Sequence, residues 1–328
     1  MTDRKQIITE ELEVLRKKEQ QDGNTFKAIA YSKVIRQIKQ LPKIVTMEDL
    51  QEVKGIGESI RKKIEEILET GILAVAEEAK KDPTLFVMDQ LMNIYGVGRV
   101  KAKDLVTNHG VTSIADLREK VVQTPDLLNG NQMIGLQYYE QFLERIPRKE
   151  MEKHEKILMK VLDDAEIVGS YRRGLPDSGD IDVLIKWPSH KSEEEGKDAL
   201  SQIVGDLHKK GYITDTLALG DKKFMGVCKA TKKGKARRLD LLLTPEKEYP
   251  FAVLYFTGSD KFNVEMRKVA LEKGYSLNEH GFTPLEETKK KRLPVMKSEE
   301  DIFRFLGYSM IDPKERKDET TLSKYFLG

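Results

Sequence analysis

Two aspartates separated by one residue, Asp180 and Asp182, are placed where they could do chemistry together. The run Ile181–Trp187, which contains the second of them, is rich in apolar and β-branched residues, as is typical of a β-strand. Residues two apart on a strand share a face, with Cβ atoms about 6–7 Å apart, so both carboxylates should project together. Such a pair could bridge two metal ions about 3.5–4 Å apart. The alternative is a surface Asp-x-Asp pair on an edge strand.

The segment 169–174, Gly-Ser-Tyr-Arg-Arg-Gly, precedes this pair and is suited to holding phosphate. Ser170 and Arg173 would lie on a turn and a short helix. There a hydroxyl, helix amides and a guanidinium can bind phosphate oxygens.

A third acid, Asp240, interrupts the run of leucines at 238–243. A carboxylate in such a strand is costly unless it is paired or bound to metal. The alternative to metal is a salt bridge with Arg237 or Arg238. Three acids on neighbouring strands beside a phosphate-holding turn are what two-metal nucleotidyl transfer requires.

One internal repeat lies in the first half of the chain. The sequence Val-Lys-Gly-Ile-Gly at 53–57 and the sequence Ile-Tyr-Gly-Val-Gly at 94–98 each lead into a helical stretch. Glycine lets the backbone approach a phosphate closely, and the next helix start favours the anion. A single copy is typical of an ordinary interhelical turn, whereas two copies favour two helix-hairpin-helix motifs that grip DNA backbone. The glycines concerned are Gly55, Gly57, Gly96 and Gly98.

The elements that must position these residues divide the chain into a helical half and a mixed half. Apolar residues recur with a period near 3.6 up to Asp82-Pro83 and again up to Ile146-Pro147. After that, short apolar runs bounded by turn residues predict strands, so we expect an α+β fold. The predicted strands are 165–169, 181–187, 214–219, 222–230 and 238–243, with a helix at 199–209.

Composition excludes several classes of protein. The 328 residues carry 57 Lys and Arg against 55 Asp and Glu, so the net charge is only +2. No apolar run approaches the roughly 18–20 residues of a membrane span, and the amino terminus is too polar for a secretory signal. A single cysteine and five histidines argue against a disulfide framework and a zinc finger. We therefore expect an intracellular protein.

The motifs resemble those of a known family. Gly-Ser-x-Arg-Arg-Gly followed by Gly-Asp-x-Asp-Val is similar to the nucleotidyltransferase signature of family X DNA polymerases. The segment 255–267, Tyr-Phe-Thr-Gly-Ser-Asp-Lys-Phe-Asn-Val-Glu-Met-Arg, resembles the nucleotide-binding segment of DNA polymerase beta. The likeness covers nearly the whole chain. It implies the beta-type core, without the BRCT or phosphoesterase domains of some relatives.

The resemblance implies a division into five parts. Residues 1–80 would form a helical deoxyribose-phosphate lyase domain with the first hairpin, and 81–147 a helical DNA-binding thumb with the second. Residues 148–246 would form the catalytic palm with a mixed sheet, and 247–317 a small nucleotide-binding subdomain. Residues 318–328 would be a tail.

The resemblance also implies roles for single residues. Asp180, Asp182 and Asp240 would bind two Mg²⁺ ions, for which Mn²⁺ could substitute, and Asp240 would lie near the primer 3′-hydroxyl. Arg238 would contact DNA, and Arg267 the template base. The incoming nucleotide would be held by Arg145, Ser170, Arg173, Gly179, Tyr255, Phe256, Gly258, Asp260 and Asn263. Na⁺ or K⁺ at the hairpins would be held by the carbonyls of Gln51, Val53, Ile56, Met92, Ile94 and Gly96.

Lys63 is the expected Schiff-base nucleophile of the lyase domain. On a helical wheel it flanks the apolar stripe of Ile60 and Ile64, whereas Lys62 faces solvent. A lysine beside apolar surface loses solvation, which frees its amine to attack an aldehyde. Lys27 and Tyr31 match positions that bind the 5′-phosphate.

The chain departs from the family pattern at several positions. Ser59 and Val75 stand where beta-type enzymes carry lysines, which weakens the expected 5′-phosphate grip. Leu242 replaces an arginine that changes partners during closure. Glu279 keeps one of that arginine's partners, while His280 replaces the other, a tyrosine.

Basic and terminal segments suggest partners. The cations from Lys229 to Arg238 predict a DNA-contacting loop or a solvated hairpin. Lys289–Arg292 resembles a nuclear localisation stretch, so a eukaryotic chain would be nuclear. The tail Glu319-Thr-Thr-Leu-Ser-Lys-Tyr-Phe resembles a sliding-clamp peptide, with Leu322, Tyr325 and Phe326 on one apolar face. The alternative is that this end packs back on the nucleotide-binding subdomain.

We therefore expect a monomeric polymerase that fills short gaps in double-stranded DNA with dNTPs during base excision repair and removes a 5′-deoxyribose phosphate. Two other functions stay open at this point. One is a template-independent nucleotidyltransferase, and the other is a non-catalytic DNA-binding scaffold.

Overall fold

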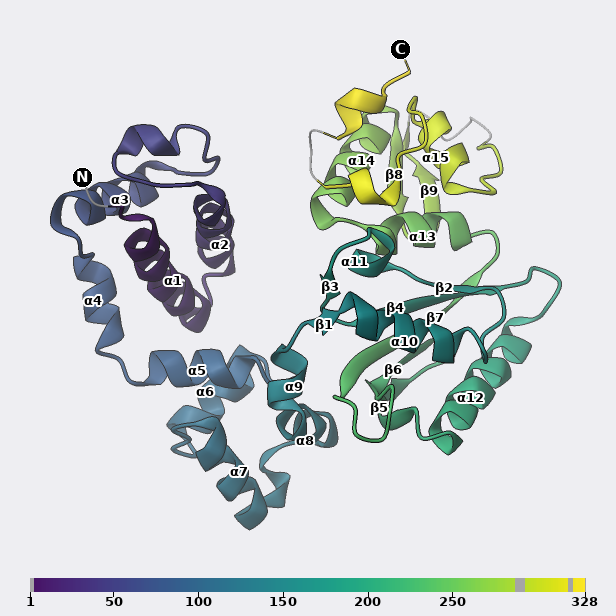
Figure 1. Ribbon diagram of the computed structural model, residues 1–328, viewed down its shortest axis with the longest axis horizontal. Coiled ribbons are helices and arrows are strands. Elements are labelled where there is room, and N and C mark those ends of the chain that lie inside the picture. The colour runs from purple at the N-terminus through teal and green to yellow at the C-terminus, as the bar shows by residue number, and fades with distance from the viewer. Residues whose placement is uncertain (1–2, 287–292, 318–320, 328) are drawn as a thin grey trace. The chain divides into compact units, whose positions relative to one another are not determined.

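The structure, a computed structural model, describes residues 3–286, 293–317 and 321–327 (Figure 1). The chain divides into two compact units, Met1–Tyr139 and Glu140–Gly328. The described residues of the first unit form helices and turns, and the second unit combines helices with sheets. The α+β prediction is therefore confirmed.

Amphipathic helices build the first unit. Those helices are α1 (Lys5–Asp22), α2 (Thr25–Gln40), α3 (Glu58–Thr70), α4 (Ala74–Lys80), α5 (Thr84–Met92), α6 (Arg99–Thr107), α7 (Ile114–Gln123) and α8 (Gly130–Gln137), with 3₁₀ turns η1 (Met47–Leu50) and η2 (Pro125–Leu127). Their apolar faces bury two separate clusters, one around Leu12 and Ile64 and one around Leu91 and Leu105. The helical period predicted both cores, and Pro83 separates α4 from α5 as expected.

The second unit is organised around a five-stranded sheet with the strand order β2-β4-β7-β6-β5 (Figure 1). Strands β4 and β7 run parallel, and the other neighbours are antiparallel. Helices α10 and α12 pack on one face and α13 on the other. The bounds are α9 (Tyr139–Leu143), α10 (Arg148–Leu158), β2 (Ala165–Ile167), β4 (Ile181–Trp187), α12 (Glu193–Lys209), β5 (Ile213–Leu219), β6 (Lys223–Cys228), β7 (Arg237–Pro245) and α13 (Tyr249–Thr257).

All five predicted strands are present in this sheet. The first is shorter than predicted, because Gly169 has a φ of +66° and begins the short helix α11 (Gly169–Arg172). The predicted helix at 199–209 begins six residues earlier, at Glu193, where Ser192 and Glu195 form a capping box. Two small sheets were not predicted: β1 (Ile146–Pro147) with β3 (Asp177–Ser178), and β8 (Tyr275–Asn278) with β9 (Gly281–Pro284).

A second, smaller core lies in the last part of the chain. It packs aromatic and aliphatic side chains of Phe262, Phe303, Leu306 and Leu322. The elements around it are α14 (Asp260–Glu272), β8, β9, α15 (Glu299–Phe305), η4 (Pro313–Glu315) and η5 (Leu322–Tyr325).

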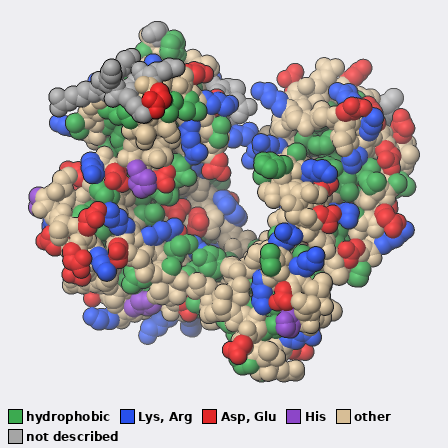
Figure 2. Space-filling model, turned by 180° about the vertical axis from the view of Figure 1, so that it is seen from behind, with side chains coloured by type: hydrophobic (Ala, Val, Ile, Leu, Met, Phe, Trp, Pro, Cys, Tyr) green, Lys and Arg blue, Asp and Glu red, His purple; other side chains and the backbone are tan. Residues whose placement is uncertain are grey.

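Charges are mixed over the surface. On the face shown in Figure 2, Lys and Arg side chains alternate with Asp and Glu, in keeping with the net charge of +2. Among the described residues, no helix is both long and apolar enough to cross a membrane.

A buried polar cluster lies beneath α10 in the sheet core. His154 Nδ1 is 2.8 Å from the Tyr212 hydroxyl oxygen and 3.8 Å from Cys228 Sγ. Both His154 and Cys228 are 0 % exposed. Burial lowers the pKa of His154 to about 4 and raises the pKa of the Cys228 thiol to about 12. The imidazole is therefore neutral and the thiol protonated at neutral pH.

We expect His154 to make the fold sensitive to acid. Between pH 6.5 and 4 the unfolded chain protonates this imidazole while the folded chain does not, so stability falls as pH falls. The full loss across that window is about 3 kcal/mol, at 1.36 kcal/mol for each pKa unit. Urea unfolding of the wild type and His154→Gln at pH 7, 5.5 and 4.5 measures this loss. Equal pH slopes for the two proteins would contradict it.

Candidate active site

The three aspartates lie together on one face of the five-stranded sheet. Asp182 on β4 and Asp240 on β7 are direct partners across two parallel strands. Their flanking residues Ile181, Val183 and Leu239 point to the opposite face and pack in the main core. Asp180 precedes β4 by one residue, so it shares the face of Asp182. Asp182 and Asp240 thus lie on neighbouring strands, as the sequence predicted.

Crowding perturbs two of these carboxylates. Desolvation first, then the charges of Asp180 and Asp240, raises the pKa of Asp182 to about 7. Desolvation and the charge of Asp240 raise the pKa of Asp180 as well. Each negative charge opposes ionisation of the others.

Asp240 is bound on both oxygens by cationic side chains. Arg238 Nη2 lies 2.7 Å from Oδ1, and Lys223 Nζ lies 3.1 Å from Oδ2. The salt bridge with Arg238 is the alternative that the sequence left open. Across the described ranges, no group of three acid, His or Cys side chains is gathered closely enough to hold a metal ion as it stands.

The donor chemistry of the site nevertheless fits hard divalent cations. Carboxylate oxygens are the ligands that Mg²⁺ prefers. A cation would also remove the repulsion that raises the pKa of Asp182. The remaining requirement is that Asp240 exchange a protein cation for a metal ion.

The phosphate-holding turn adjoins these acids. An added Cβ at Gly169, the first residue of α11, would lie 3.7 Å from Asp182 Oδ2. The hydroxyl of Ser170 donates a hydrogen bond to Ser178 Oγ at 2.9 Å. The Arg173 guanidinium donates to the carbonyl of Thr257, next to Gly258. The start of α11 thus lies against Asp182, and the side chains of Ser170 and Arg173 are both held by hydrogen bonds.

Arg145 and Gly179 lie next to the aspartates, since Gly179 directly precedes Asp180. An added Cβ at Gly179 would be 3.2 Å from an Arg145 nitrogen, so these two residues are neighbours. Arg145 forms an exposed ion pair with Asp177 at 2.7 Å.

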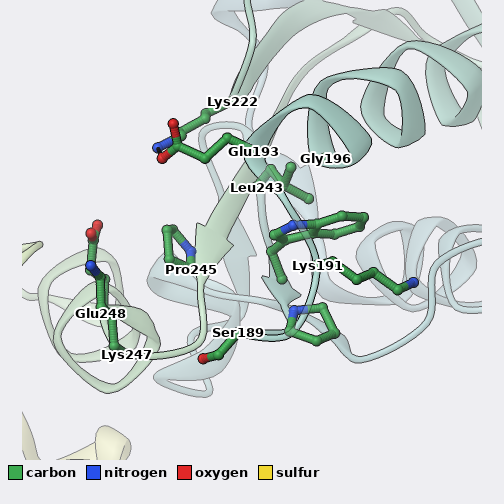
Figure 3. Close-up of a pocket in the computed structure, with 11 residues that line it drawn as sticks. Ser189, Lys191, Glu193, Gly196, Lys222, Leu243, Pro245, Lys247 and Glu248 are labelled. Atoms are coloured by element: carbon green, nitrogen blue, oxygen red, sulfur yellow. Dashed lines mark hydrogen bonds and ion pairs between the residues drawn. The ribbon is translucent and has the colours of Figure 1, made fainter.

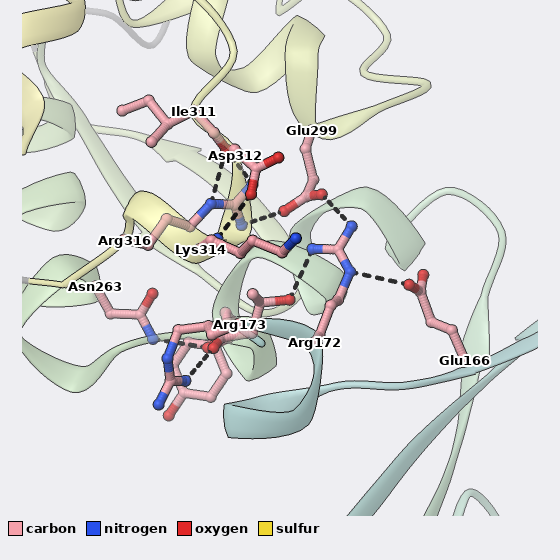
Figure 4. Close-up of polar contacts among 11 residues, drawn as sticks. Glu166, Arg172, Arg173, Asn263, Glu299, Ile311, Asp312, Lys314 and Arg316 are labelled. Carbon is pink, nitrogen blue, oxygen red and sulfur yellow. Dashed lines mark hydrogen bonds and ion pairs between the residues drawn. The ribbon is translucent and has the colours of Figure 1, made fainter. Parts of the chain in front are cut away.

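A buried ion network holds the turn against the carboxy-terminal subdomain (Figure 4). Arg172 donates to Glu166, to the Thr257 hydroxyl and to Glu299. Glu299 also accepts from Arg316, which is 0 % exposed. Sequence patterns contain no signal of this network, because Arg172 and Glu299 lie 127 positions apart.

The predicted nucleotide-binding residues gather around the start of α14. Asn263 is buried and donates to the Tyr255 carbonyl at 2.7 Å. Arg267 stacks over the Tyr255 ring, 5.5 Å from its centroid. All three line a small hollow beside β8. Phe256 packs edge-on against Tyr255, and Asp260 is exposed at the first turn of α14.

The position occupied by Leu242 serves packing. Its side chain joins an apolar cluster with Leu184 and Val253 beneath α13. His280 pairs with Glu248 at 2.8 Å instead. Position 242 therefore contributes an apolar contact between β7 and α13 where the family pattern has an arginine.

The basic segment from Lys229 to Arg238, which ends in the first two residues of β7, is only partly available to DNA. Arg238 is bound to Asp240 and its side chain is 16 % exposed. Arg237 is buried against Glu150 and the carbonyls of Gln141 and Glu144, so its inclusion in a DNA-contacting loop was wrong. Lys235 pairs with Glu144 at the surface.

The two hairpins in the first unit have the same geometry. Gly55 and Gly96 have positive φ of +91° and +81°, which glycine adopts without strain. Gly57 and Gly98 are the N-caps of α3 and α6, with open space where a Cβ would point. The repeat is therefore structural, and both helix starts are open to an approaching backbone.

The hydrogen bonds that the hairpin carbonyls accept differ between the copies. In the first hairpin, Gly55 accepts from the Gly57 amide at 3.1 Å. In the second hairpin, Ile94 accepts from the Val97 amide at 3.0 Å and Gly96 accepts from the Gln132 side chain at 2.9 Å. Each carbonyl has two lone pairs, so one remains for a cation. The other predicted carbonyls, Met92 in this hairpin and Gln51, Val53 and Ile56 in the first, lie at the ends of α5 and η1 and in the turn before α3.

Lys63 lies beside the apolar face of α3, as the helical wheel predicted. It is half-buried, whereas Lys62 is exposed and paired with Glu58. Its ammonium group donates to the carbonyl and hydroxyl of Ser59 at 3.1 and 2.8 Å. Its hydrogen-bond partner Ser59 thus stands at a position where the family pattern has lysine.

The predicted 5′-phosphate residues have contrasting environments. The Lys27 side chain is 68 % exposed and lies 3.6 Å from Glu19. The Tyr31 ring is buried in the helical core, and burial raises the pKa of its hydroxyl. Phe26, next to Lys27 at the first turn of α2, is 91 % exposed.

The tail does not form the exposed apolar face that was expected. Leu322 is buried in the subdomain core and Tyr325 packs against it, while Phe326 is exposed beside the Tyr308 ring. The Ser309 amide donates to the Tyr325 carbonyl at 3.0 Å. Glu319 and the basic stretch Lys289–Arg292 lie outside the described residues.

A cavity of about 210 Å³ lies away from the carboxylates, at the far ends of β4 and β7 (Figure 3). Trp187, Leu243 and Pro245 form its apolar lining, with Lys191 and Lys222 at its rim. None of the predicted site residues lines it.

Models of four domain families match in sequence along the chain. A helix-hairpin-helix domain matches residues 3–73, and the fingers domain of DNA polymerase lambda matches 89–143. The DNA polymerase beta palm matches 145–246, and the DNA polymerase beta thumb matches 252–317. In these names, "thumb" falls on the nucleotide-binding subdomain and "fingers" on the segment that we called the thumb above.

Whole-chain comparisons agree with these matches. The chain is 32 % identical to rat (Rattus norvegicus) DNA polymerase lambda and 28 % identical to that of Arabidopsis thaliana, over 94 % and 90 % of its own length. It spans 56 % and 58 % of those two proteins. It is 27 % identical to human (Homo sapiens) DNA-directed DNA/RNA polymerase mu over 94 % of its length, which is 68 % of that protein.

The first hairpin lies in the matched helix-hairpin-helix domain and the second in the matched fingers domain. The phosphate turn and the three aspartates lie in the matched palm. The chain belongs to family X of the DNA polymerases.

Proposed function

We propose that this chain is a DNA-directed DNA polymerase that fills short gaps on a template. The observation that carries the proposal is the register of Asp182 with Asp240 on one sheet face, next to the turn that bears Ser170 and Arg173. The similarity to polymerases lambda and mu supports the same activity.

The carboxylates would hold two Mg²⁺ ions. When bound, these ions lower the pKa of the attacking 3′-hydroxyl and neutralise the charge of the triphosphate and the departing pyrophosphate. Asp180 and Asp182 would bind both ions, and Asp240 would bind the ion that acts on the primer 3′-hydroxyl. Their preset position on adjacent strands limits the reorganisation required.

The triphosphate would be held by the turn that precedes β4. Ser170 supplies a hydroxyl, Arg173 a guanidinium and Gly179 an amide, and Arg145 adds positive charge at the same edge. The contact between Arg173 and Thr257 supports this assignment, because it connects the triphosphate end of the site to the nucleotide-binding segment.

The base and sugar would lie along the start of α14. Tyr255, Phe256, Gly258 and Asp260 would line them. Asn263 and Arg267 would read the incoming and template bases, and both already face the hollow beside β8.

The two hairpins would grip DNA backbone on either side of the gap. Gly55, Gly57, Gly96 and Gly98 leave the helix starts open, and Na⁺ or K⁺ at the hairpin carbonyls would add positive charge. Lys27 would bind the 5′-phosphate with Tyr31. The exposed ring of Phe26 beside Lys27 suits stacking on an unpaired base.

The proposal is tested on a duplex with a one-nucleotide gap, a 5′-phosphate and Mg²⁺, supplying each dNTP separately. We expect addition of one nucleotide that matches the template. Addition that ignores the template would favour a template-independent transferase. No addition, with gapped DNA still bound, would favour a scaffold.

We propose a second activity, removal of a 5′-deoxyribose phosphate by Lys63. Its neutral amine would attack the sugar aldehyde and form a Schiff base with loss of water, and β-elimination would then break the C3′–O bond and leave a 5′-phosphate on the DNA. The place of Lys63 beside the apolar stripe of α3 supports this role. Lys63→Ala is expected to lose most of the adduct that borohydride traps on such a substrate. Lys62→Ala, one residue away on the exposed face of α3, is the control and should retain it. Equal trapping by both variants would contradict the assignment.

Base excision repair is the process that these two activities would serve together. A nuclear location is supported only by the sequence of Lys289–Arg292. Clamp binding rests on the tail motif, and it would require Leu322 and Tyr325 to leave the subdomain core.

A further inference from the structure

Asp240 lies between two protein cations that differ in exposure. Arg238 is two residues away on β7, and its side chain is 16 % exposed. Lys223 comes from the neighbouring strand β6, and its side chain is 46 % exposed. The carboxylate between them is only 12 % exposed.

The sheet register explains why Lys223 reaches this carboxylate. Met225 lies directly opposite Asp240 on the antiparallel pair of β6 and β7. Lys223, two residues before Met225, is therefore on the same face as Asp240 and diagonal to it, within reach of a long side chain. Lys222 next to it turns away and pairs with Glu193 at 2.6 Å.

A divalent cation and the Lys223 ammonium group compete for the same oxygen. The ammonium lies 3.1 Å from Asp240 Oδ2, so a metal ion bound there would meet a like charge at close range. Lys223 is the cation that can leave, because it is a compact charge on a flexible, half-exposed stem. Arg238 is more buried and would remain on Oδ1.

We infer that Lys223 is a positioning residue that neutralises Asp240 before metal binding and must release Asp240 Oδ2 when a divalent ion binds. The inference rests on the proposed role of Asp240 as a metal ligand. It gives the site a resident counter-ion that a metal ion replaces.

The test measures Mn²⁺ binding to the full chain without DNA or nucleotide, from the electron paramagnetic resonance signal of free Mn²⁺. Lys223→Gln is expected to bind Mn²⁺ about fivefold more tightly, the ratio that corresponds to a partly exposed ion pair of about 1 kcal/mol. Lys223→Arg keeps the charge and should bind as the wild type does. Lys222→Gln is the matched control and should also be unchanged.

A double substitution separates this inference from the proposed function. In an Asp240→Asn background, Lys223→Gln should no longer change Mn²⁺ affinity, because the shared oxygen has lost its charge. Unchanged or weaker Mn²⁺ binding by the single variant Lys223→Gln would overturn the inference. If Asp182→Asn and Asp240→Asn both bind Mn²⁺ as the wild type does, the metal site itself is wrong and the proposed function fails with it.

Discussion

Asp182→Asn is expected to lower kcat for nucleotide insertion about 10³-fold, since it removes several kcal/mol of transition-state charge stabilisation. The amide cannot bridge two cations as a carboxylate does. Gapped DNA should still bind with near wild-type affinity, because the hairpins lie elsewhere in the chain. Single-turnover insertion with saturating dNTP measures the loss directly.

Folding measurements distinguish this loss from misfolding. The pKa of Asp182 is raised from 3.8 to about 7 in the folded chain, so the stability of the metal-free fold falls between these pH values and the full loss is present above pH 7. Asp182→Asn should therefore unfold at a higher urea concentration than the wild type at pH 8 in EDTA. Asp206→Asn, on the exposed side of α12, is the control for both measurements. An Asp182→Asn enzyme that keeps a tenth of wild-type kcat would contradict the catalytic role.

Glu299→Gln is expected to destabilise the second unit by about 3–5 kcal/mol, because two guanidinium groups lose their shared buried counter-charge. Glu299 accepts from Arg172 at 2.8 Å and from Arg316 at 2.5 Å, and its side chain is 6 % exposed. Arg316 has no exposed surface through which water could replace this partner. Urea unfolding monitored by circular dichroism would measure the change.

The neighbouring residue provides a matched control. Glu300 lies on the same helix and pairs with Arg304, but both side chains are more than half exposed. Glu300→Gln should change stability by no more than about 0.5 kcal/mol, as surface substitutions generally do. Similar effects of the two substitutions would show that burial of Glu299 does not determine its contribution.

Much of the site follows from short-range patterns in the sequence. A short run of apolar and β-branched residues defined the strand that carries Asp182, and the glycine repeat defined both hairpins. The pairing of Asp182 with Asp240 is not a local property. The sequence indicated that both acids lie in apolar strands of one sheet. Which residues face each other depends on how these two strands pair in the folded chain.

Other features depend on contacts between distant parts of the chain. From the sequence, Arg237 was expected in a basic loop, but its guanidinium forms a salt bridge with Glu150 on α10. From the sequence, Leu322 was expected to bind a partner protein. In the structure, apolar side chains of α14 and α15 bury it instead. A short motif shows that an apolar side chain could bind a partner. Whether that side chain is exposed depends on the tertiary packing of the chain itself.

The buried thiol of Cys228 makes the chain convenient for optical experiments. It is the only cysteine in the sequence, and burial with a pKa near 12 leaves almost no thiolate to react with maleimides at neutral pH. Cysteines introduced at exposed positions in each unit could therefore be labelled with a fluorophore pair in the otherwise native sequence. Energy transfer between them would follow how the separation of the two units changes when gapped DNA is added.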